Sequence, residues 1–215
     1  MTTGYSDEPT RQFRDALRLL FILRFAAEEI VGTPPVPDAV RVVSSQKRLQ
    51  KIDFWVRNPD HLAHALLDVY QIAHDERWLR QARAILGSDE PEVRRDAMAK
   101  YLYGAFEPID TGLAPLLSYG LARTLRHPET RRQRYFLLAR GAEVAERLLA
   151  DLAEARWYAE RAALVGRLCL GRSGEELARM QYQLPEYASA PNGETIASIA
   201  GQVRARLAEL ETARG

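Results

Sequence analysis

The amino-acid sequence predicts a mainly α-helical protein with one short β-hairpin. Apolar residues recur at helical spacing along most of the 215 residues, and proline, glycine and capping residues separate these apolar runs. Strand-like alternation is confined to the neighbourhood of Tyr135 and Leu137, which follow a turn that contains Pro128. Hydrophobic residues make up 47% and charged residues 27% of the chain, so a folded globular protein is expected.

Residues 1–87 are expected to form an N-terminal helical region. Asn58 and Pro59 end one helix and begin the next, because asparagine caps a helix N-terminus and proline suits its first turn. Three prolines in residues 33–40 predict an extended linker, because proline lacks the amide hydrogen that a helix needs. The expected helices cover residues 10–31 and 45–57, a stretch that begins at Pro59, and a stretch around Trp78 that ends at Gly87.

Residues 88–152 are expected to form a winged helix-turn-helix domain, the core of the fold. The predicted order is a helix at 91–104, a helix at 111–125, a hairpin with arms at 124–127 and 133–139, and a helix that Gly141 opens. The join after the hairpin is similar to the closing pattern Y-x-L-T-x-x-G-x-x-x-A-x-x-L of winged-helix domains. The matching residues here are Tyr135, Leu137, Gly141, Ala145 and Leu148, while Leu138 replaces the usual capping threonine.

Residues 153–215 are expected to form a C-terminal helical extension. Its helices are predicted at 155–170, 174–183 and 195–213, and a loop at 188–193 precedes the last of them. The predicted fold is therefore a winged helix-turn-helix core with helical extensions on both sides and one short β-hairpin.

The predicted hairpin is strongly basic. Residues 121–140 hold six arginines and one glutamate, a local charge of +5, although the whole chain has a net charge of only +1. Arginine-rich wings contact nucleic-acid phosphates and gain affinity by releasing counterions. The alternative is a solvated hairpin with no ligand. The candidate DNA-binding residues are Arg123, Arg126, Arg131, Arg132 and Arg134.

The helix predicted at 111–125 lacks the side chains that read base edges. Its outward candidates are only Thr111, Ser118 and Tyr119, among leucine, alanine and glycine residues. A helix this apolar is expected to pack against protein, either within the chain or on a partner. The candidate protein-interface residues are Trp55, Tyr119, Phe136 and Trp157, and the tryptophans could equally be core anchors.

No combination of residues indicates catalysis, so no enzymatic activity, metal or cofactor is expected. The chain lacks the phosphate-binding and nucleophile motifs of ATPases, dinucleotide-binding enzymes and hydrolases. His61, His64 and His74 are expected to be surface histidines, and Cys169, the single cysteine, is expected to pack as a small apolar residue. Asp53 and Arg57 have the spacing of an i,i+4 ion pair.

No apolar stretch approaches the ~20 residues of a membrane helix. The longest candidate, residues 17–32, is interrupted by arginine and glutamate. Residues 1–11 also lack the basic-then-apolar order of a signal peptide. We therefore expect a cytoplasmic protein with no membrane partner.

Four segments together resemble the middle component of bacterial three-component ABC systems, which are conflict or defence modules built around an SMC/Rad50-like ATPase. The segments are RLQKIDFWVRNPDHLAHAL at 48–66, FEPIDTGLAPLLSYGLARTL at 106–125, YFLLARGAEVAERLL at 135–149 and RAALVGRLCLGRSGEELARMQYQLPEY at 161–187. The resemblance lies in their order and spacing and covers roughly residues 45–187.

This resemblance implies a non-catalytic adaptor, similar to the kleisin-associated winged-helix proteins of SMC complexes. Such an adaptor would bind the SMC/Rad50-like ABC ATPase and could also bind a further effector subunit and DNA without sequence preference. The alternative is a winged-helix transcriptional regulator of the MarR/PadR kind, in which the flanking helices form a dimer interface. A small enzyme is a third interpretation, which no set of nucleophile, base or metal ligands favours.

Overall fold

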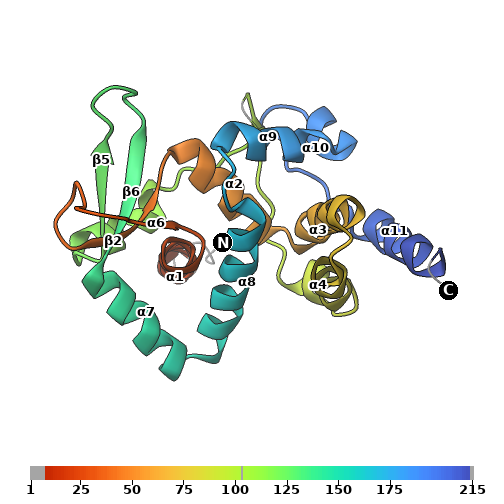
Figure 1. Ribbon diagram of the computed structural model, residues 1–215, viewed down its shortest axis with the longest axis horizontal. Coiled ribbons are helices and arrows are strands. Elements are labelled where there is room, and N and C mark those ends of the chain that lie inside the picture. Colours follow the sequence, from red (N-terminus) through yellow and green to blue (C-terminus); the bar gives the residue numbers. More distant parts are fainter. Residues whose placement is uncertain (1–7, 103, 214–215) are drawn as a thin grey trace, which may run out of the picture. The chain divides into compact units, whose positions relative to one another are not determined.

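The computed structural model describes residues 8–102 and 104–213 of the chain. The protein is mainly helical, with 61% of its residues in helices and 12% in strands of small antiparallel sheets, so the predicted α-helical class is confirmed. The chain forms two compact units (Figure 1). Unit 1 consists of Met1–Asp53 and Pro108–Gly174, and unit 2 of Phe54–Glu107 and Glu175–Gly215. These units are interleaved along the chain and differ from the three consecutive ranges expected from the sequence, 1–87, 88–152 and 153–215.

Unit 1 combines helices from both of its segments with one sheet. The elements of its first segment are α1 (Glu8–Phe25), β1 (Glu28–Glu29), β2 (Ala39–Val43) and the start of α2 (Gln46–Arg57). Those of its second segment are α6 (Asp110–Ser118), β5 (Ala122–Arg126), β6 (Gln133–Leu138), α7 (Ala139–Asp151) and α8 (Ala153–Cys169).

The sheet of unit 1 has the strand order β1-β2-β6-β5, and all of its pairs are antiparallel. Strand β2 pairs with β6 as far as Val43 and Tyr135. Strands β5 and β6 continue beyond that point through the pairs Leu125–Arg134 and Arg126–Gln133. The end of the hairpin therefore projects past the sheet as a two-stranded arm, which Figure 1 shows above β2.

The core of unit 1 forms around α1. Phe21, Ile22 and Leu23 are completely buried in it, and α1 packs against α6 and α8. Two glycines allow these helices to approach closely. A Cβ on Gly112 of α6 would lie 3.0 Å from the Leu19 side chain, and one on Gly166 of α8 would lie 2.7 Å from the Phe25 carbonyl oxygen.

Close packing where the hairpin meets α7 explains why residue 141, singled out by the winged-helix pattern, is a glycine. A Cβ on Gly141 would lie 2.2 Å from the carbonyl oxygen of Leu121, so only glycine fits there without a shift of the backbone. Leu138, at the N-cap position, makes no side-chain capping bond. The amide of Ala139 instead donates to the carbonyl oxygen of Asp38, at 2.8 Å. A backbone carbonyl thus takes the place of the missing threonine.

Unit 2 is a helical assembly with one two-stranded ribbon. Helix α3 packs along α4, and α11 packs against both. The C-terminal end of α2 and most of α9 (Gly174–Tyr182) also belong to this unit. Its other elements are α3 (Pro59–Ala73), α4 (Glu76–Leu86), α5 (Glu90–Val93), β3 (Lys100–Tyr101), β4 (Gly104–Ala105), α10 (Pro185–Ser189) and α11 (Ala200–Thr212).

The prediction of a helix at residues 91–104 is wrong. Helix α5 ends at Val93, and the following chain takes its backbone partners from distant segments: the Asp96 amide donates to the Arg57 carbonyl oxygen, and the Lys100 amide to that of Glu194. Residue 103 lies outside the described residues.

Other boundaries also shift. The first helix ends at Phe25 rather than near residue 31, because β1 follows it, and the expected linker at 33–40 runs into strand β2. The helix expected at 111–125 ends at Ser118, since Gly120 adopts a left-handed conformation (φ 64°) and β5 begins at Ala122. The last helix begins at Ala200 rather than 195.

Candidate nucleic-acid interface

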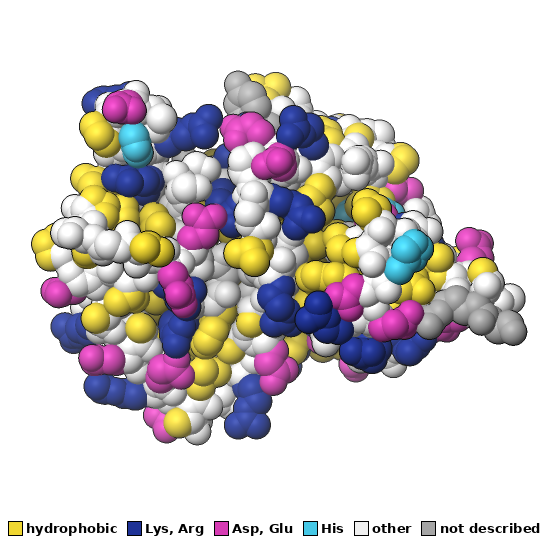
Figure 2. Space-filling model, in the orientation of Figure 1, with side chains coloured by type: hydrophobic (Ala, Val, Ile, Leu, Met, Phe, Trp, Pro, Cys, Tyr) yellow, Lys and Arg dark blue, Asp and Glu magenta, His cyan; other side chains and the backbone are white. Residues whose placement is uncertain are grey.

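One basic surface of unit 1 is the arginine ribbon, which we define as residues 123–134 of the β5–β6 hairpin. Arg123, Arg126, Arg131 and Arg132 are exposed, and Arg134 is half-buried. Figure 2 shows Lys and Arg side chains gathered around the projecting end of this hairpin. Arg126, Arg131, Arg132 and Arg134 thus lie on the projecting arm, and Arg123 lies at its base, where β6 still pairs with β2.

The register of the two strands distributes these arginines around the ribbon. Directly paired residues share a face, so Arg123 lies on the face of Phe136, and Arg126 lies on the opposite face with Gln133. The remaining two, Arg131 and Arg132, belong to the turn. The ribbon therefore presents guanidinium groups on both faces and at its tip, as suits a polyanion that runs past it rather than a single small anion.

Three of the ribbon arginines have no protein counter-ion. Among the described residues, Arg123, Arg126 and Arg131 make no ion pair, and Glu129 is the only acidic residue between positions 123 and 134. Arg134 stacks over the ring of Phe136, with its guanidinium carbon 5.2 Å from the ring centroid. An exposed cation without a counter-ion gains more from a phosphate than one that must first leave a carboxylate.

The tip of the ribbon is held by local hydrogen bonds. The His127 amide donates to the Arg132 carbonyl oxygen at 2.8 Å, and the Arg131 amide donates to the His127 carbonyl oxygen at 3.0 Å. Arg131 takes a left-handed conformation (φ 56°), and the His127 Nδ1 accepts from the amides of Glu129 and Thr130 at 3.3 and 3.4 Å. The tip arginines are therefore carried by an ordered turn.

Helix α6, which precedes the ribbon, presents few groups for base recognition. Gly112, Leu113 and Leu116 are buried, and the exposed side chains are small or apolar apart from those at the two ends. As expected, Thr111, Ser118 and Tyr119 are exposed; Tyr119 keeps 67% of its surface accessible. No arginine, lysine, asparagine or glutamine lies between Asp110 and Tyr119.

The four candidate interface residues have different surroundings. Trp55 is 2% and Phe136 1% exposed, so both are core residues rather than surface anchors. Trp157 is half-buried beneath the guanidinium of Arg161, 5.5 Å from the ring centroid, and only Tyr119 is well exposed. Strand β6 was expected to be buried on one face. Tyr135, Phe136 and Leu137 are all buried, so both of its faces are covered.

Buried arginines organise the interior of unit 1. Arg18 of α1 donates to Asp53 and to Asp15, at 2.7 Å in each case. Burial lowers the pKa of Arg18, but the two carboxylates outweigh it and raise the pKa above its usual value. The pair Asp53–Arg57, expected from spacing, stays a prediction, whereas the contact of Asp53 with Arg18 had no sequence signal.

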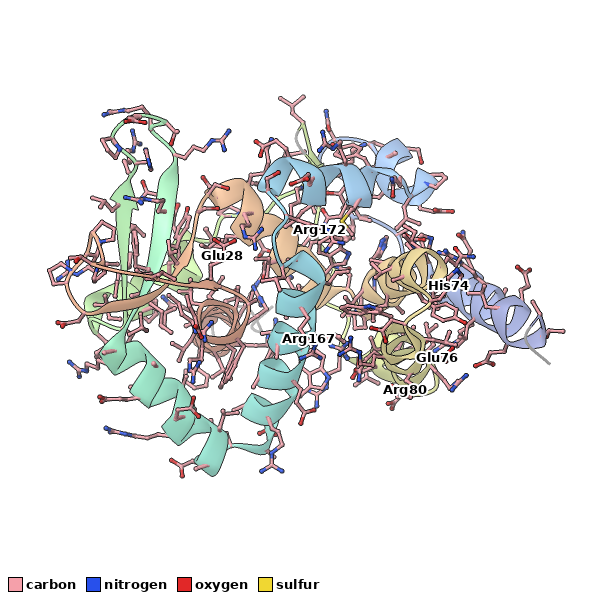
Figure 3. All side chains as sticks on the ribbon, in the orientation of Figure 1. Glu28, His74, Glu76, Arg80, Arg167 and Arg172 are labelled. Carbon is pink, nitrogen blue, oxygen red and sulfur yellow. The ribbon has the colours of Figure 1, made fainter. Side chains whose placement is uncertain are left out.

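Two further arginines hold the C-terminal end of α8, near the position labelled Arg172 in Figure 3. Arg48 is buried and donates to the Cys169 carbonyl oxygen at 3.1 Å, while its guanidinium also lies 3.2 Å from Glu28. Arg172 donates to the Leu168 carbonyl oxygen. Cationic groups at this position satisfy the last helix carbonyls and complement the helix dipole.

Unit 2 contains a buried polar network that sequence reasoning missed. Asp60 is fully buried; its Oδ1 accepts from the His61 amide, and its Oδ2 accepts from Ser198 Oγ at 2.7 Å and from the Ile199 amide at 2.8 Å. The network anchors the chain that leads into α11.

His61 is fully buried rather than a surface histidine. Its Nε2 lies 3.0 Å from the Ala197 carbonyl oxygen, and its ring packs edge-on against Phe54. Burial is the main cause that lowers the pKa of His61. Because Ser198 bonds directly to Asp60 and the ring of His61 faces a carbonyl, Ser198, His61 and Asp60 do not form a nucleophile–base pair.

Arg57, at the end of α2, binds the irregular segment 94–107 within unit 2. Its guanidinium lies 3.0 Å from the Asp96 carboxylate, and Nε donates to the Asp96 carbonyl oxygen at 3.0 Å. Glu107 forms a further ion pair with it. A buried arginine that binds two acidic residues and a carbonyl is a structural element, with no group left for a substrate.

The described part of the chain holds no group of three or more His, Cys, Asp or Glu side chains arranged to bind a metal ion. Burial raises the pKa of the Cys169 thiol to about 12, so it is not a thiolate at neutral pH. No described helix is long and apolar enough to cross a membrane.

Comparisons of the chain with protein-family models, with curated proteins and with solved structures gave no match.

Proposed function

We propose that unit 1 is a winged helix assembled from two separate segments of the chain, with the arginine ribbon as its wing. The order α1, β2, α2, α6, β5, β6 follows the helix–strand–helix–helix–hairpin order of winged helices. The strand order β2-β6-β5 and the packing of α1 on α6 support this assignment. In this proposal residues 54–107 are an insertion between the second and third helices, so the winged helix does not occupy 88–152.

We propose that the wing holds nucleic-acid phosphates without reading sequence. The observation that carries this proposal is the arginine ribbon, on which Arg126 and Arg131 project past the sheet, Arg123 lies at the base, and all three are exposed and make no ion pair among the described residues. Phosphate contacts fix position and supply salt-dependent affinity but carry no sequence information. The exposed face of α6, which would enter a groove in a sequence reader, offers the uncharged polar side chains of Thr111, Ser118 and Tyr119 beside the acidic Asp110, and no basic or amide side chain.

We further propose that the protein is a non-catalytic adaptor of an SMC/Rad50-like ABC ATPase in bacterial defence. The support is the order and spacing of the four segments that resemble the middle component of three-component systems. In this proposal the ATPase supplies all nucleotide chemistry, the adaptor steadies DNA through its wing, and a further effector subunit can join the assembly.

The DNA proposal is tested by replacing Arg123, Arg126 and Arg131 with alanine and titrating a random-sequence duplex at several salt concentrations. Each lost phosphate contact lowers the slope of log K against log salt by about 0.9. The matched control replaces three exposed arginines of α7 and α8, Arg147, Arg156 and Arg167, and so removes the same charge elsewhere on unit 1. We expect a loss of affinity and slope in the ribbon variant that clearly exceeds the loss in the control.

Equal losses in the two variants would overturn the wing proposal, because they would indicate attraction by net charge alone. A preference for one sequence over random DNA of about a thousandfold or more would instead favour the MarR/PadR-like regulator. The ATPase partnership is tested by co-expression with an SMC/Rad50-like ATPase encoded beside the gene. Failure of the two proteins to co-purify at low salt would contradict it.

A further inference from the structure

Strand β5 lies at one edge of the sheet of unit 1: it pairs with β6 on one side, and no described strand pairs with its other side (Figure 1). Its exposure increases along the strand. Ala122 is only 1% exposed, whereas Arg123, Leu125 and Arg126 are exposed and Thr124 is half-buried. Most of this edge is therefore accessible to another molecule.

The register of the hairpin shows which backbone groups of β5 face the open edge. The Leu138 amide donates to the Leu121 carbonyl oxygen, and the His127 amide donates to that of Arg132. Both pairs continue the register of β5 with β6, in which hydrogen-bonded and non-bonded pairs alternate. The odd-numbered residues of β5 therefore bond to β6, and the even-numbered residues turn their N–H and C=O groups away from it.

Thr124 and Arg126 thus each direct one amide N–H and one carbonyl oxygen toward the open edge. Among the described residues, no backbone group bonds to these donors and acceptors. A row in which donors and acceptors alternate matches the backbone of another extended strand. It matches a phosphate poorly, because a phosphate only accepts hydrogen bonds and would face the two carbonyl oxygens as well. The edge therefore favours a polypeptide over a nucleic acid.

The side chains along this edge favour an acidic partner. Arg123 and Arg126 are exposed, lie on opposite faces of β5 and make no ion pair among the described residues. Leu125, between them, is 38% exposed. Directly opposed side chains of paired strands interact, so a strand beside β5 would gain from carboxylates opposite the two arginines and from an apolar side chain opposite Leu125.

A second copy of the chain is a poor occupant of this edge. If β5 paired antiparallel with β5 of another copy, the register centred on the strand would place Arg123 of one copy opposite Arg126 of the other. Like charges on paired strands destabilise the pairing, and charged residues on an edge strand discourage such self-association. The same arginines would attract a strand that carries the opposite charge.

We propose that the free edge of β5 binds an extended acidic segment of a partner protein, which adds to the sheet beside β5. The segment carries two acidic residues separated by two others, so that the carboxylates lie opposite Arg123 and Arg126. An apolar residue of the segment lies opposite Leu125. The backbone groups of Thr124 and Arg126 bind the segment, and the arginines select its charge. This inference does not rest on DNA binding by the wing, because it depends on paired backbone donors and acceptors.

The probe is a short peptide with blocked ends and the core glutamate–valine–threonine–glutamate, titrated against the whole chain at low salt by fluorescence anisotropy. A second peptide carries N-methyl groups on the core amides that would face β5, and a matched control carries them on the alternate amides. All three peptides have the same charge. We expect methylation of the facing amides to weaken binding by about tenfold or more, and methylation of the alternate amides to change it by less than about threefold. Replacing both glutamates by lysine should abolish binding.

The matching change in the protein is Thr124→Pro, which removes an outward N–H and leaves the charge of the arginine ribbon and the donors to β6 intact. Thr124→Val is the control, because it alters the side chain and keeps the amide. We expect Thr124→Pro to weaken binding of the unmodified peptide by about tenfold or more, and Thr124→Val by less than about threefold.

Equal binding of the two methylated peptides would overturn the proposal, because charge alone would then hold the peptide. The two peptides are compared on the unaltered chain, so this result stands whether or not Thr124→Pro folds. Failure of the unmodified peptide to bind at about 1 mM would overturn the proposal as well. So would a dimer of the unaltered chain that Thr124→Pro dissociates in sedimentation, because the edge would then belong to a second copy.

Discussion

Arg126 and Arg131 of the arginine ribbon extend into solvent, whereas Arg18 and Arg48 lie buried in the same unit. The interior pair bind Asp15, Asp53, Glu28 and a helix carbonyl, and they make these contacts within the fold. The two ribbon arginines make no ion pair among the described residues. Arginine therefore stabilises the fold in the interior of unit 1, whereas on the ribbon it remains available for a ligand.

This difference shows that the surroundings of an arginine, rather than the local charge, separate a binding surface from a structural one. The segment 48–57 contains two arginines and a lysine, and all ten of its residues are buried. The ribbon holds five arginines in twelve residues, and its end projects beyond β2, where no acidic strand residue faces it.

The largest effect is expected from Arg18→Met. This change leaves the buried carboxylate of Asp53 without its partner on α1, and breaking one side of a buried ion pair costs about 3–5 kcal/mol. The matched change on the ribbon is Arg126→Met, which removes the same charge from an exposed site and should alter the free energy of unfolding by at most about 0.5 kcal/mol. Urea denaturation of both variants measures the contrast. Equal losses of unfolding free energy in the two variants would mean that Arg126 also stabilises the fold of unit 1.

The next largest effect is expected at the base of the ribbon, from Gly141→Ala. The new Cβ would meet the Leu121 carbonyl oxygen at 2.2 Å, and relief requires a shift of α7 against β5 at a cost of about 1–3 kcal/mol. Ribbon charge is unchanged, so duplex affinity measured on the folded fraction should fall much less than in the arginine variants. The control is Gly201→Ala, where nothing lies within 4 Å of the added atom.

The elements that depend on local signals were predictable from the sequence. Asn58-Pro59 does separate α2 from α3, and Gly87 caps α4. The hairpin was found because its strands are joined by a short turn and alternate visibly around Tyr135. Gly141 was identified from a pattern, although its reason, the carbonyl of Leu121, lies some twenty residues away.

The elements that depend on distant partners were not predictable. After Val93, apolar residues recur at a spacing typical of a helix. The backbone of this segment nevertheless bonds to Arg57 and to residues 193–196 instead of forming helical hydrogen bonds. Strand β2 follows a proline-rich stretch and exists because β6 pairs with it. The burial of Asp60 and His61 likewise depends on residues 196–199, which no local window contains.

A smaller effect is expected from pH, at a buried histidine. The pKa of His61 is lowered in the folded state, mainly by burial, so the folded protein prefers the neutral ring. The stabilisation is present above the unfolded pKa of about 6.5 and is lost as the pH falls through the folded value, with a slope of at most about 1.4 kcal/mol per pH unit. Global urea unfolding between about pH 7.5 and 5 measures it.

In His61→Gln this acid-induced loss should become shallower, whatever the stability of the variant at neutral pH. His127→Gln is the control on the arginine ribbon, where the ring touches only the turn. An unchanged pH profile in His61→Gln would show that burial of this ring does not govern the acid stability of unit 2.

The smallest effect is expected on α6, the helix beside the arginine ribbon. Replacing Thr111, Ser118 and Tyr119 together by alanine removes the exposed uncharged side chains there that could hydrogen-bond to a base edge. Because the apolar side of the helix stays buried, the free energy of unfolding should change by less than about 1 kcal/mol. Duplex affinity should stay within about twofold, since no phosphate contact is lost. A tenfold loss, larger for one DNA sequence than for another, would move recognition from the ribbon to the helix. The arginines would then be supporting contacts to the backbone on either side of a groove that α6 enters.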